Sequence, residues 1–350
     1  MSKKLAATQY PVPTDSVLQT PGSLETKLLE ALDDVEQMLV RETQTQRENT
    51  SELVSHLRAA GGKRMRPLLT LLISQLGAPN QPVSTKVKQA AVAVELTHLA
   101  SLYHDDLMDE ATMRRGVRAA HVQWTNTLAV MAGDLIFARA SLLVSELGPT
   151  IVAQHSQTFE RLCLGQMHDI FGPGDDDDPI EFYIDVLRDK TGALIGCAAL
   201  YGAELSGCDA ATVSAVTQFG EDLGVAFQIA DDVLDLQATE AQSGKTPGAD
   251  LRDGTKTLPV LLLEKTVQDG RDTESDRALL KAIGDTDSLQ DDAVLAKVVA
   301  QLAAHPATAE TKRLAGEWVE RALAHLQNIP DGKVKHALVE FAHLQINRLQ

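Results

Sequence analysis

The chain has 350 residues, with 32 Lys and Arg against 49 Asp and Glu, and its formal net charge is −17 at pH 7. The apolar fraction of 44% is enough for a sizeable core and too high for a disordered chain. The acidic balance argues against nucleic-acid binding, which needs a basic face toward phosphates, so no nucleic-acid partner is expected. Aromatic residues make up only 4%, and a core of Ala, Leu and Val favours helices over a β-sandwich.

The cysteines and the N-terminus indicate a cytoplasmic protein. Cys163, Cys197 and Cys208 form no CxxC pair, and we interpret them as reduced thiols. The residues after Lys3 and Lys4 do not form the apolar core of a signal peptide. No run reaches about 18 apolar residues, so no transmembrane segment is predicted.

In chain order, residues 1–22 contain three prolines and no apolar period, and we predict a mobile N-terminal tail. Ser23 is a candidate N-cap, and from there apolar residues recur at intervals of three and four. No strand alternation or repeat of solenoid length is evident. The sequence therefore predicts a single all-α domain over 23–350, a large helical bundle. Helices are predicted over 23–48, 51–59, 66–76, 83–109, 122–147, 150–170, 180–206, 209–237, 258–268, 288–303, 307–327 and 332–348.

Two of these helices end in an acidic cluster of the form DDxxD, one starting at Asp105 and one at Asp231. The first and last aspartates of each cluster are one helical turn apart, and they repel each other unless a cation lies between them. The sequences before both clusters are apolar, so each helix is predicted to be buried and its carboxylates need a partner. Mg²⁺ accepts one or two carboxylates together with phosphate oxygens. We therefore predict Mg²⁺ binding at both clusters, whereas the acid run 175–178, flanked by Gly and Pro, is predicted to be solvated loop.

Basic residues that could meet a phosphate group lie in four places. GGKRMRP at 61–67 stands just before a helix, where backbone N–H groups also attract anions. The other three are Arg114-Arg115, Lys190-Thr191, and the loop after the second cluster with Lys245 and Lys256. Any one of these is more often a surface cation than a ligand, and their meaning depends on whether they converge in the fold.

Two other patterns point elsewhere and are weaker. Gly244-Lys245-Thr246 is similar to part of a phosphate-binding P-loop, but Thr239 stands where that motif requires Gly, and the segment follows a helix. His104-Asp105, with His98 nearby, is similar to a His-Asp metal phosphohydrolase. That chemistry needs further paired ligands, so it stays a minor alternative.

Taken in order, seven segments resemble the trans-polyprenyl diphosphate synthases, in particular long-chain members of the octaprenyl and heptaprenyl type. They are GGKRMRP, ELTHLASLYHDDLMDEATMRRG, GDLIFARA, GQ at 165–166, KTGALIGCA, FQIADDVLDL and GKTPGADLRDGTKTLPV. The resemblance covers roughly residues 50–350. It implies an all-α fold around a deep central cavity and a head-to-tail condensation of isopentenyl diphosphate with an allylic diphosphate. It also implies Mg²⁺ as cofactor, about three ions per active site.

The resemblance implies a role for each matching residue. The main Mg²⁺ ligands would be Asp105, Asp109 and Asp231, supported by Asp106 and Asp235. The allylic diphosphate would be held by Arg114, Lys190, Thr191, Gln228, Lys245 and Lys256, of which Lys190 and Lys256 count as catalytic. Isopentenyl diphosphate would be held by Gly62, Lys63, Arg66, His98 and Arg115. Cations and Mg²⁺ suit this reaction because negative charge develops on the leaving diphosphate.

Product length is expected to depend on the turn before the first cluster. Ala100 and Ser101 lie five and four residues before Asp105 and face roughly the same side of the helix. In the family a bulky aromatic there closes the cavity, whereas both residues are small here, so we expect a product longer than C20. The alternative is that they only pack against a neighbouring helix, in which case Met131, Ile136 and Phe137 are weaker candidates for the floor.

Two alternative functions stay open. One is a shorter-chain synthase that makes C15 to C20 products, and the other is a regulatory subunit of a heteromeric synthase. Both acidic clusters and all the matching cations are intact, which favours an active subunit. A terpene cyclase is disfavoured because its second metal motif usually contains Asn, Ser and Glu. The family is usually homodimeric, so a homodimer is expected, with peripheral membrane contact for release of the product.

Overall fold

The computed structural model describes residues 23–79, 81–237 and 247–346, and confirms the all-α prediction. Within them the only strands are β1 (Met113–Arg114) and β2 (Val117–Arg118), an antiparallel pair in which Met113 faces Arg118. The predicted tail at 1–22 and Lys245 lie outside the described residues. The chain divides into two compact units, and each is described by itself: unit 1 is Met1–Glu160, Leu194–Gly220 and His325–Phe341, and unit 2 is Arg161–Ala193, Glu221–Ala324 and Ala342–Gln350.

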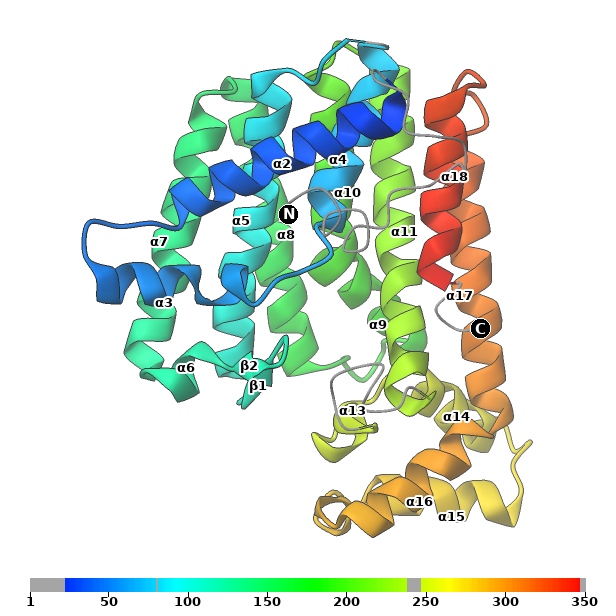
Figure 1. The fold of residues 1–350 in the computed structure, drawn as a ribbon. Coiled ribbons are helices and arrows are strands. Elements are labelled where there is room, and N and C mark those ends of the chain that lie inside the picture. The colour runs from blue at the N-terminus through cyan, green and yellow to red at the C-terminus, as the bar shows by residue number, and fades with distance from the viewer. Residues whose placement is uncertain (1–22, 80, 238–246, 347–350) are drawn as a thin grey trace. The chain divides into compact units, whose positions relative to one another are not determined.

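Unit 1 is built around the long helix α5 (Thr85–Met108). The hydroxyl of Ser84 caps α5 by accepting the N–H of Val87, and Ala, Val and Leu side chains are buried around most of its circumference. A helix that is apolar all round is an internal one, and α5 packs against α2, α4 and α7 (Figure 1). The helices confined to unit 1 are α2 (Leu24–Glu42), α3 (Glu48–Ala59), α4 (Met65–Gly77), α5, α6 (Ala120–Gln123) and α7 (Asn126–Ser145).

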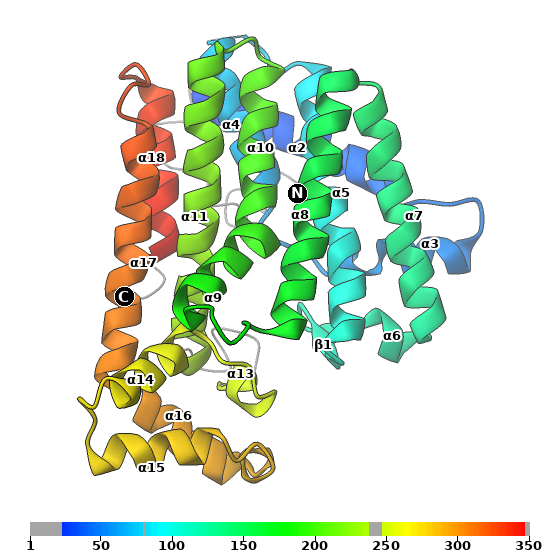
Figure 2. The same ribbon diagram turned by 180° about the vertical axis from the view of Figure 1, so that it is seen from behind.

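Helix α7 lies beside α5 in both views (Figures 1 and 2). It is the one helix in the described part of the chain that is long and apolar enough to cross a membrane, and 39% of that stretch is buried. Core helices of soluble proteins meet the same criterion, and α7 packs on α5, with Ala129, Ala132 and Ile136 among its buried residues. Its opposite face leaves Met131 and Leu142 exposed.

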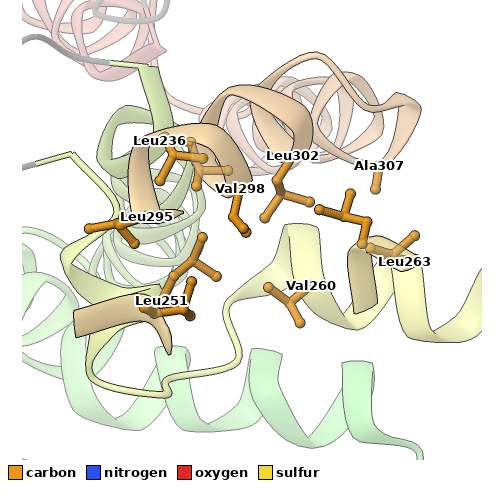
Figure 3. Close-up of a cluster of buried hydrophobic side chains, with 11 residues drawn as sticks. Leu236, Leu251, Val260, Leu263, Leu295, Val298, Leu302 and Ala307 are labelled. Atoms are coloured by element: carbon orange, nitrogen blue, oxygen red, sulfur yellow. The ribbon is translucent and has the colours of Figure 1, made fainter. Parts of the chain in front are cut away.

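Unit 2 has a separate hydrophobic core, in which α11, α13, α14 and α16 meet (Figure 3). Leu236, Leu251, Leu263 and Leu302 are among its buried members. The elements confined to unit 2 are α9 (Pro179–Leu187), the π-helical turn η1 (Arg188–Gly192), α13 (Ala249–Arg252), α14 (Leu258–Gln268), α15 (Glu274–Ile283), the 3₁₀ turn η2 (Ser288–Gln290) and α16 (Asp292–Ala303). The helices α8 (Pro149–Phe171), α10 (Ala193–Glu204), α11 (Ala210–Gln237), α17 (Pro306–His325) and α18 (Lys333–Ile346) each contribute residues to both units.

The structure differs from the predicted elements in several places, including the unpredicted helix α13 and the division of 288–303 into η2 and α16. The helix predicted over 180–206 is divided by a π-helical turn, η1 (Arg188–Gly192), which no apolar period reveals. Helix α15 was not predicted, because its ten residues are rich in charge. Its signal was the N-terminal capping box, in which Thr273 and Asp276 bond each other's backbone N–H. The pair β1–β2 was missed because two residues per strand are too few for an alternating pattern.

Candidate active site

The first acidic cluster ends a single half-exposed face of α5. His98, Ser101, Leu102 and Asp105 are partly exposed and recur at intervals of three and four, whereas nearly all their neighbours on α5 are buried. Helix α5 ends at its C-cap Asp109, which is exposed and donates its N–H to the carbonyl of Asp105 at 2.8 Å. Asp105 and Asp109 are therefore the accessible carboxylates of this cluster, and Ser101 lies one turn before them.

The middle aspartate of the first cluster points inward. Asp106 is fully buried, and Arg114 of β1 donates its Nε–H to Asp106 Oδ1 at 2.5 Å. Burial raises the pKa of Asp106, while Arg114 opposes the shift. The sequence predicted that Asp106 supports the Mg²⁺ ligands and that Arg114 holds the allylic diphosphate. In this structure the two side chains pair with each other, and both roles stay predictions.

The turn after β1 directs Arg115 toward the GGKRMRP segment. Arg115 and Gly116 have φ of 53° and 77°, and a two-residue hairpin of this kind needs positive φ at both positions. Arg115 Nη1 donates to the carbonyls of Leu57, at 3.1 Å, and Gly61. Its Nη2 lies 3.5 Å from His98 Nε2. The hairpin thereby brings Arg115 beside His98, as expected for two ligands of one diphosphate.

Arg64 fixes the GGKRMRP segment from inside. It has a left-handed φ of 49°, is buried, and forms ion pairs with Glu36 of α2 and with Glu95 of α5, the latter at 3.0 Å. A Cβ on Gly62 would lie 2.8 Å from Arg64 Nη1 and 3.0 Å from Arg115 Nη1, so the guanidinium groups would have to shift, and the φ of 150° at this position itself favours glycine. The sequence gave no sign that Arg64, unlike Lys63, is a structural cation.

Two of the predicted diphosphate ligands in unit 1, Arg66 and Arg115, lie near His98. Burial lowers the pKa of Arg66 to about 10, and its Nε is buried without a hydrogen-bond partner within the described chain. Burial and the nearby Arg66, Arg115, Arg114 and Arg64 hold the pKa of His98 well below its usual value. Lys63 is exposed in the loop. Arg66, His98 and Arg115 therefore converge, as the sequence could not establish, and their surplus positive charge attracts an anion.

Removing the buried cation Arg64 is expected to destabilise unit 1. Arg64→Ala leaves Glu95, which is 2% exposed, without its ion-pair partner, and breaking a buried pair costs about 3–5 kcal/mol. Chemical denaturation measures the loss, with Lys86→Ala on the exposed side of α5 as a control within about 0.5 kcal/mol of wild type. A loss below about 1 kcal/mol for Arg64→Ala would contradict this role.

The second acidic cluster ends a half-exposed face of α11. Gln228, Asp231 and Asp235 are partly exposed and recur at intervals of three and four, between residues that are mostly buried. The hydroxyl of Thr191 donates to Gln228 Oε1 at 3.4 Å. Thr191 therefore lies beside the face of α11 that carries Gln228, Asp231 and Asp235, and the roles that the resemblance implies for them stay predictions.

The π-helical turn η1 places Lys190 next to α8. Its Nζ lies 2.7 Å from Asp169 Oδ2 of α8. A Cβ on Gly165 would lie 2.7 Å from the backbone N of Lys190, so glycine lets α8 and η1 approach this closely. Asp189 of the same turn pairs with Arg161 at 2.8 Å. Widened π-turns of this kind recur at functional sites.

The middle aspartate of the second cluster also points inward. Asp232 is 2% exposed, and its Oδ2 accepts the hydroxyl of Tyr183 at 2.8 Å and the N–H of Leu258 at 3.3 Å. Burial raises the pKa of Asp232 well above its usual range, with nearby Asp250 adding to the shift. Asp235 Oδ2 lies 3.4 Å from the N–H of Asp250. Asp250 lies within one of the segments that resemble the family, and Tyr183 lies outside them. The sequence predicted a role for neither residue.

Two of the predicted cations are not placed beside this group. Lys256 is exposed, and its Nζ lies 2.7 Å from Glu264 Oε1 of α14. Lys245 lies outside the described residues. Their predicted contact with the allylic diphosphate stays a prediction.

The donor chemistry fits Mg²⁺ completed by a substrate. No group of three or more His, Cys, Asp or Glu side chains converges as a metal cage within 23–79, 81–237 and 247–346. Each cluster instead offers two carboxylates one turn apart on an exposed face, Asp105 with Asp109 and Asp231 with Asp235. Mg²⁺ is commonly held in this way, by one or two carboxylates together with phosphate oxygens and water.

Comparison with known proteins decides the family. The model of the polyprenyl synthetase family matches residues 47–302. The chain belongs to the polyprenyl synthetase family. It is 40% identical over 314 residues to the nonaprenyl diphosphate synthase of Mycobacterium tuberculosis, covering 90% of this chain and 91% of that protein.

Two further relatives show the breadth of this family. The chain is 34% identical to heptaprenyl diphosphate synthase component 2 of Geobacillus stearothermophilus, covering 88% of this chain and 92% of that one. It is similar in structure, with a TM-score of 0.81 and 38% identity, to a geranylgeranyl pyrophosphate synthase of Corynebacterium glutamicum complexed with calcium and isoprenyl diphosphate; 95% of this chain and 99% of that one are covered. As a member of this family, the chain is a prenyltransferase of the trans-prenyl diphosphate synthase type.

Proposed function

We propose that this polyprenyl synthetase condenses isopentenyl diphosphate head to tail onto an allylic diphosphate and releases an all-trans polyprenyl diphosphate longer than C20. The observation that carries the proposal is the shared arrangement of the two acidic clusters. In each, the first and last aspartates lie on an exposed helix face, while the middle aspartate is buried and hydrogen-bonded. A solvated acidic helix end needs no such arrangement, whereas binding of Mg²⁺ does.

The basic group of unit 1 binds isopentenyl diphosphate in this proposal. Arg66, His98 and Arg115 converge there, with Lys63 and Gly62 in the adjoining loop. Because the pKa of His98 is held well below its usual value, the ring is neutral at physiological pH and contributes a hydrogen bond rather than a charge. The arginines supply charge-assisted hydrogen bonds to the diphosphate.

The acidic faces and the cations near them act on the allylic diphosphate. Asp105, Asp109, Asp231 and Asp235 hold Mg²⁺, and bound Mg²⁺ stabilises the charge that develops on the leaving diphosphate. Lys190, Thr191 and Gln228 orient the diphosphate for departure. The double bond of isopentenyl diphosphate, held close and aligned, then attacks the allylic cation, and loss of a proton completes the step. The departing diphosphate is the proposed proton acceptor.

The length of the product rests on the face of α5 that carries Asp105. Ser101 is partly exposed on this face, whereas Ala100 has no exposed surface. Ser101 is therefore the member of the pair that can contact a growing chain, and its small size supports a long product. A C20 product is the second candidate, because a geranylgeranyl pyrophosphate synthase is 38% identical to this chain.

A bulky side chain at Ser101 is expected to shorten the product. Ser101→Phe fills the space beside the chain and shifts the product to C15 or C20, while the first condensation continues. Mass analysis of the products shows the shift, and Ser101→Ala is the matched control that keeps the long product. Ala100→Phe is the poorer test, because overfilling a buried position costs about 1–3 kcal/mol. An unchanged product from Ser101→Phe would place the floor elsewhere.

One assay tests the activity. The purified chain is incubated with an allylic diphosphate, labelled isopentenyl diphosphate and Mg²⁺, and the products are identified by mass. A product longer than C20 made by this chain alone supports the proposal. Activity only after a second, different polypeptide is added identifies a subunit of a heteromeric synthase, as the name "component 2" of one relative indicates for that protein.

The partners follow from the same function. We propose a cytoplasmic homodimer that contacts the membrane surface peripherally when it releases its apolar product. The exposed apolar face of α7, with Met131 and Leu142, supports a contact with a second copy. Light scattering of the purified protein distinguishes dimer from monomer.

A further inference from the structure

We infer that Tyr183 is a positioning residue of the second acidic cluster: its hydroxyl holds Asp232, and through Asp232 it sets the orientation of Asp231 and Asp235 toward Mg²⁺. The inference rests on the proposed role of Asp231 and Asp235 as metal ligands. Tyr183 itself touches neither substrate nor metal in this proposal.

The first step of the argument is the geometry of Asp232. Its Oδ2 receives two hydrogen bonds from different elements, from the Tyr183 hydroxyl of α9 at 2.8 Å and from the Leu258 N–H at the start of α14 at 3.3 Å. Successive residues of a helix point about 100° apart. Fixing Asp232 on the inner side of α11 therefore fixes the rotation of the last two turns, which carry Asp231 and Asp235.

The second step is the rigid packing of Tyr183, whose hydroxyl donates to Asp232. The ring of Tyr183 packs with Ile184 against a buried cluster that includes Val225, Ile229 and Leu258. This packing holds the ring in place and therefore fixes the position of the Tyr183 hydroxyl. Because two donors hold Asp232 Oδ2 on the inner side of α11, Asp232 acts in this proposal as the anchor, while Asp231 and Asp235 face outward.

The third step is the repulsion between the carboxylates at the end of α11. Asp231 and Asp235 lie one turn apart on the half-exposed face of α11. Their like charges repel each other when no cation is bound. A fixed hydroxyl that donates to Asp232 opposes this and keeps Asp231 and Asp235 in place before Mg²⁺ arrives. Preorganised ligands bind more tightly because less order has to be created on binding.

Tyr183→Phe tests the inference, because it keeps the packed ring and removes only the hydroxyl. Calorimetry with Mg²⁺ and inorganic diphosphate measures binding without any turnover. We expect the affinity to fall about tenfold, the value of a hydrogen bond to a charged group. In the assay the half-saturating Mg²⁺ concentration should rise while the KM for isopentenyl diphosphate stays within about twofold of wild type.

Tyr201→Phe is the matched control. Tyr201 is buried, and its hydroxyl lies 3.1 Å from His155 Nδ1 in unit 1, so the same hydroxyl group is removed from another packed ring. It should leave the Mg²⁺ dependence unchanged. An equal loss of Mg²⁺–diphosphate affinity in both variants, or none in Tyr183→Phe, would overturn the inference.

A second pair of variants tests whether Asp232 anchors or ligates. The amide oxygen of Asp232→Asn still accepts from Tyr183 and Leu258, so Mg²⁺–diphosphate binding should stay within about threefold of wild type. Asp231→Asn should lose most of it. Equal losses in the two variants would make Asp232 a ligand and refute the anchor. The outcome is separate from the proposed function: if the wild type binds Mg²⁺–diphosphate but forms no prenyl product, the function fails while the role of Tyr183 is still decided by binding.

Discussion

Asp105→Ala and Asp231→Ala are each expected to lower turnover by at least about 10²–10³-fold while the protein stays folded. Removing a group that stabilises developing charge typically costs this much in turnover. Both side chains lie on half-exposed helix faces, so truncating them leaves no buried cavity. Removal of one carboxylate also relieves repulsion within its cluster, and the melting temperature without Mg²⁺ should be unchanged or higher.

Asp176→Ala provides the matched control for these two variants. Asp176 lies exposed in the acidic loop before α9, where the sequence predicts solvated charge. It should leave turnover and Mg²⁺ dependence unchanged. Turnover near the wild-type value in Asp105→Ala or Asp231→Ala would refute the assignment of both clusters.

The sequence predicted the helical faces because helical period alone determines them. In α5 and in α11 the first and last aspartates were expected on one side, and in both helices they are partly exposed together. The same period places the middle aspartate about 100° away. That offset agrees with the burial of Asp106, while its predicted role in supporting Mg²⁺ stays a prediction.

Other features depend on contacts that a local pattern does not contain. Arg64 and Lys63 are adjacent cations, and only the left-handed turn at Arg64 and the distant partners Glu36 and Glu95 make one buried and the other exposed. The π-turn that holds Lys190 likewise needs the close approach of α8 at Gly165. Tyr183 fits an ordinary apolar helix pattern, and its hydroxyl acquires a role only because α9 packs beside α11.

The KM for isopentenyl diphosphate is expected to rise roughly ten- to a hundredfold in Arg66→Met, with a smaller change in the KM for the allylic substrate. This is the magnitude of a charge-assisted contact in a site that excludes water. Lys63→Ala should act in the same direction. The measurement is steady-state kinetics with each substrate varied in turn, and an unchanged KM for isopentenyl diphosphate in both variants would make GGKRMRP a structural helix start.

Stability distinguishes these two roles of Arg66 independently of the kinetics. Burial lowers the pKa of Arg66 to about 10, below that of a free guanidinium. At neutral pH the group is charged in the folded and the unfolded chain alike, so the folded state bears the cost of desolvating it. This cost is fully present below pH 10 and fades only as the pH rises above that value. Methionine fills a similar volume without a charge. If Arg66 serves the substrate, Arg66→Met should therefore melt at the same or a higher temperature than wild type although it binds isopentenyl diphosphate more weakly. If Arg66 instead stabilises the fold, the melting temperature of Arg66→Met should fall. A fall of several degrees with an unchanged KM for isopentenyl diphosphate would exclude the binding role.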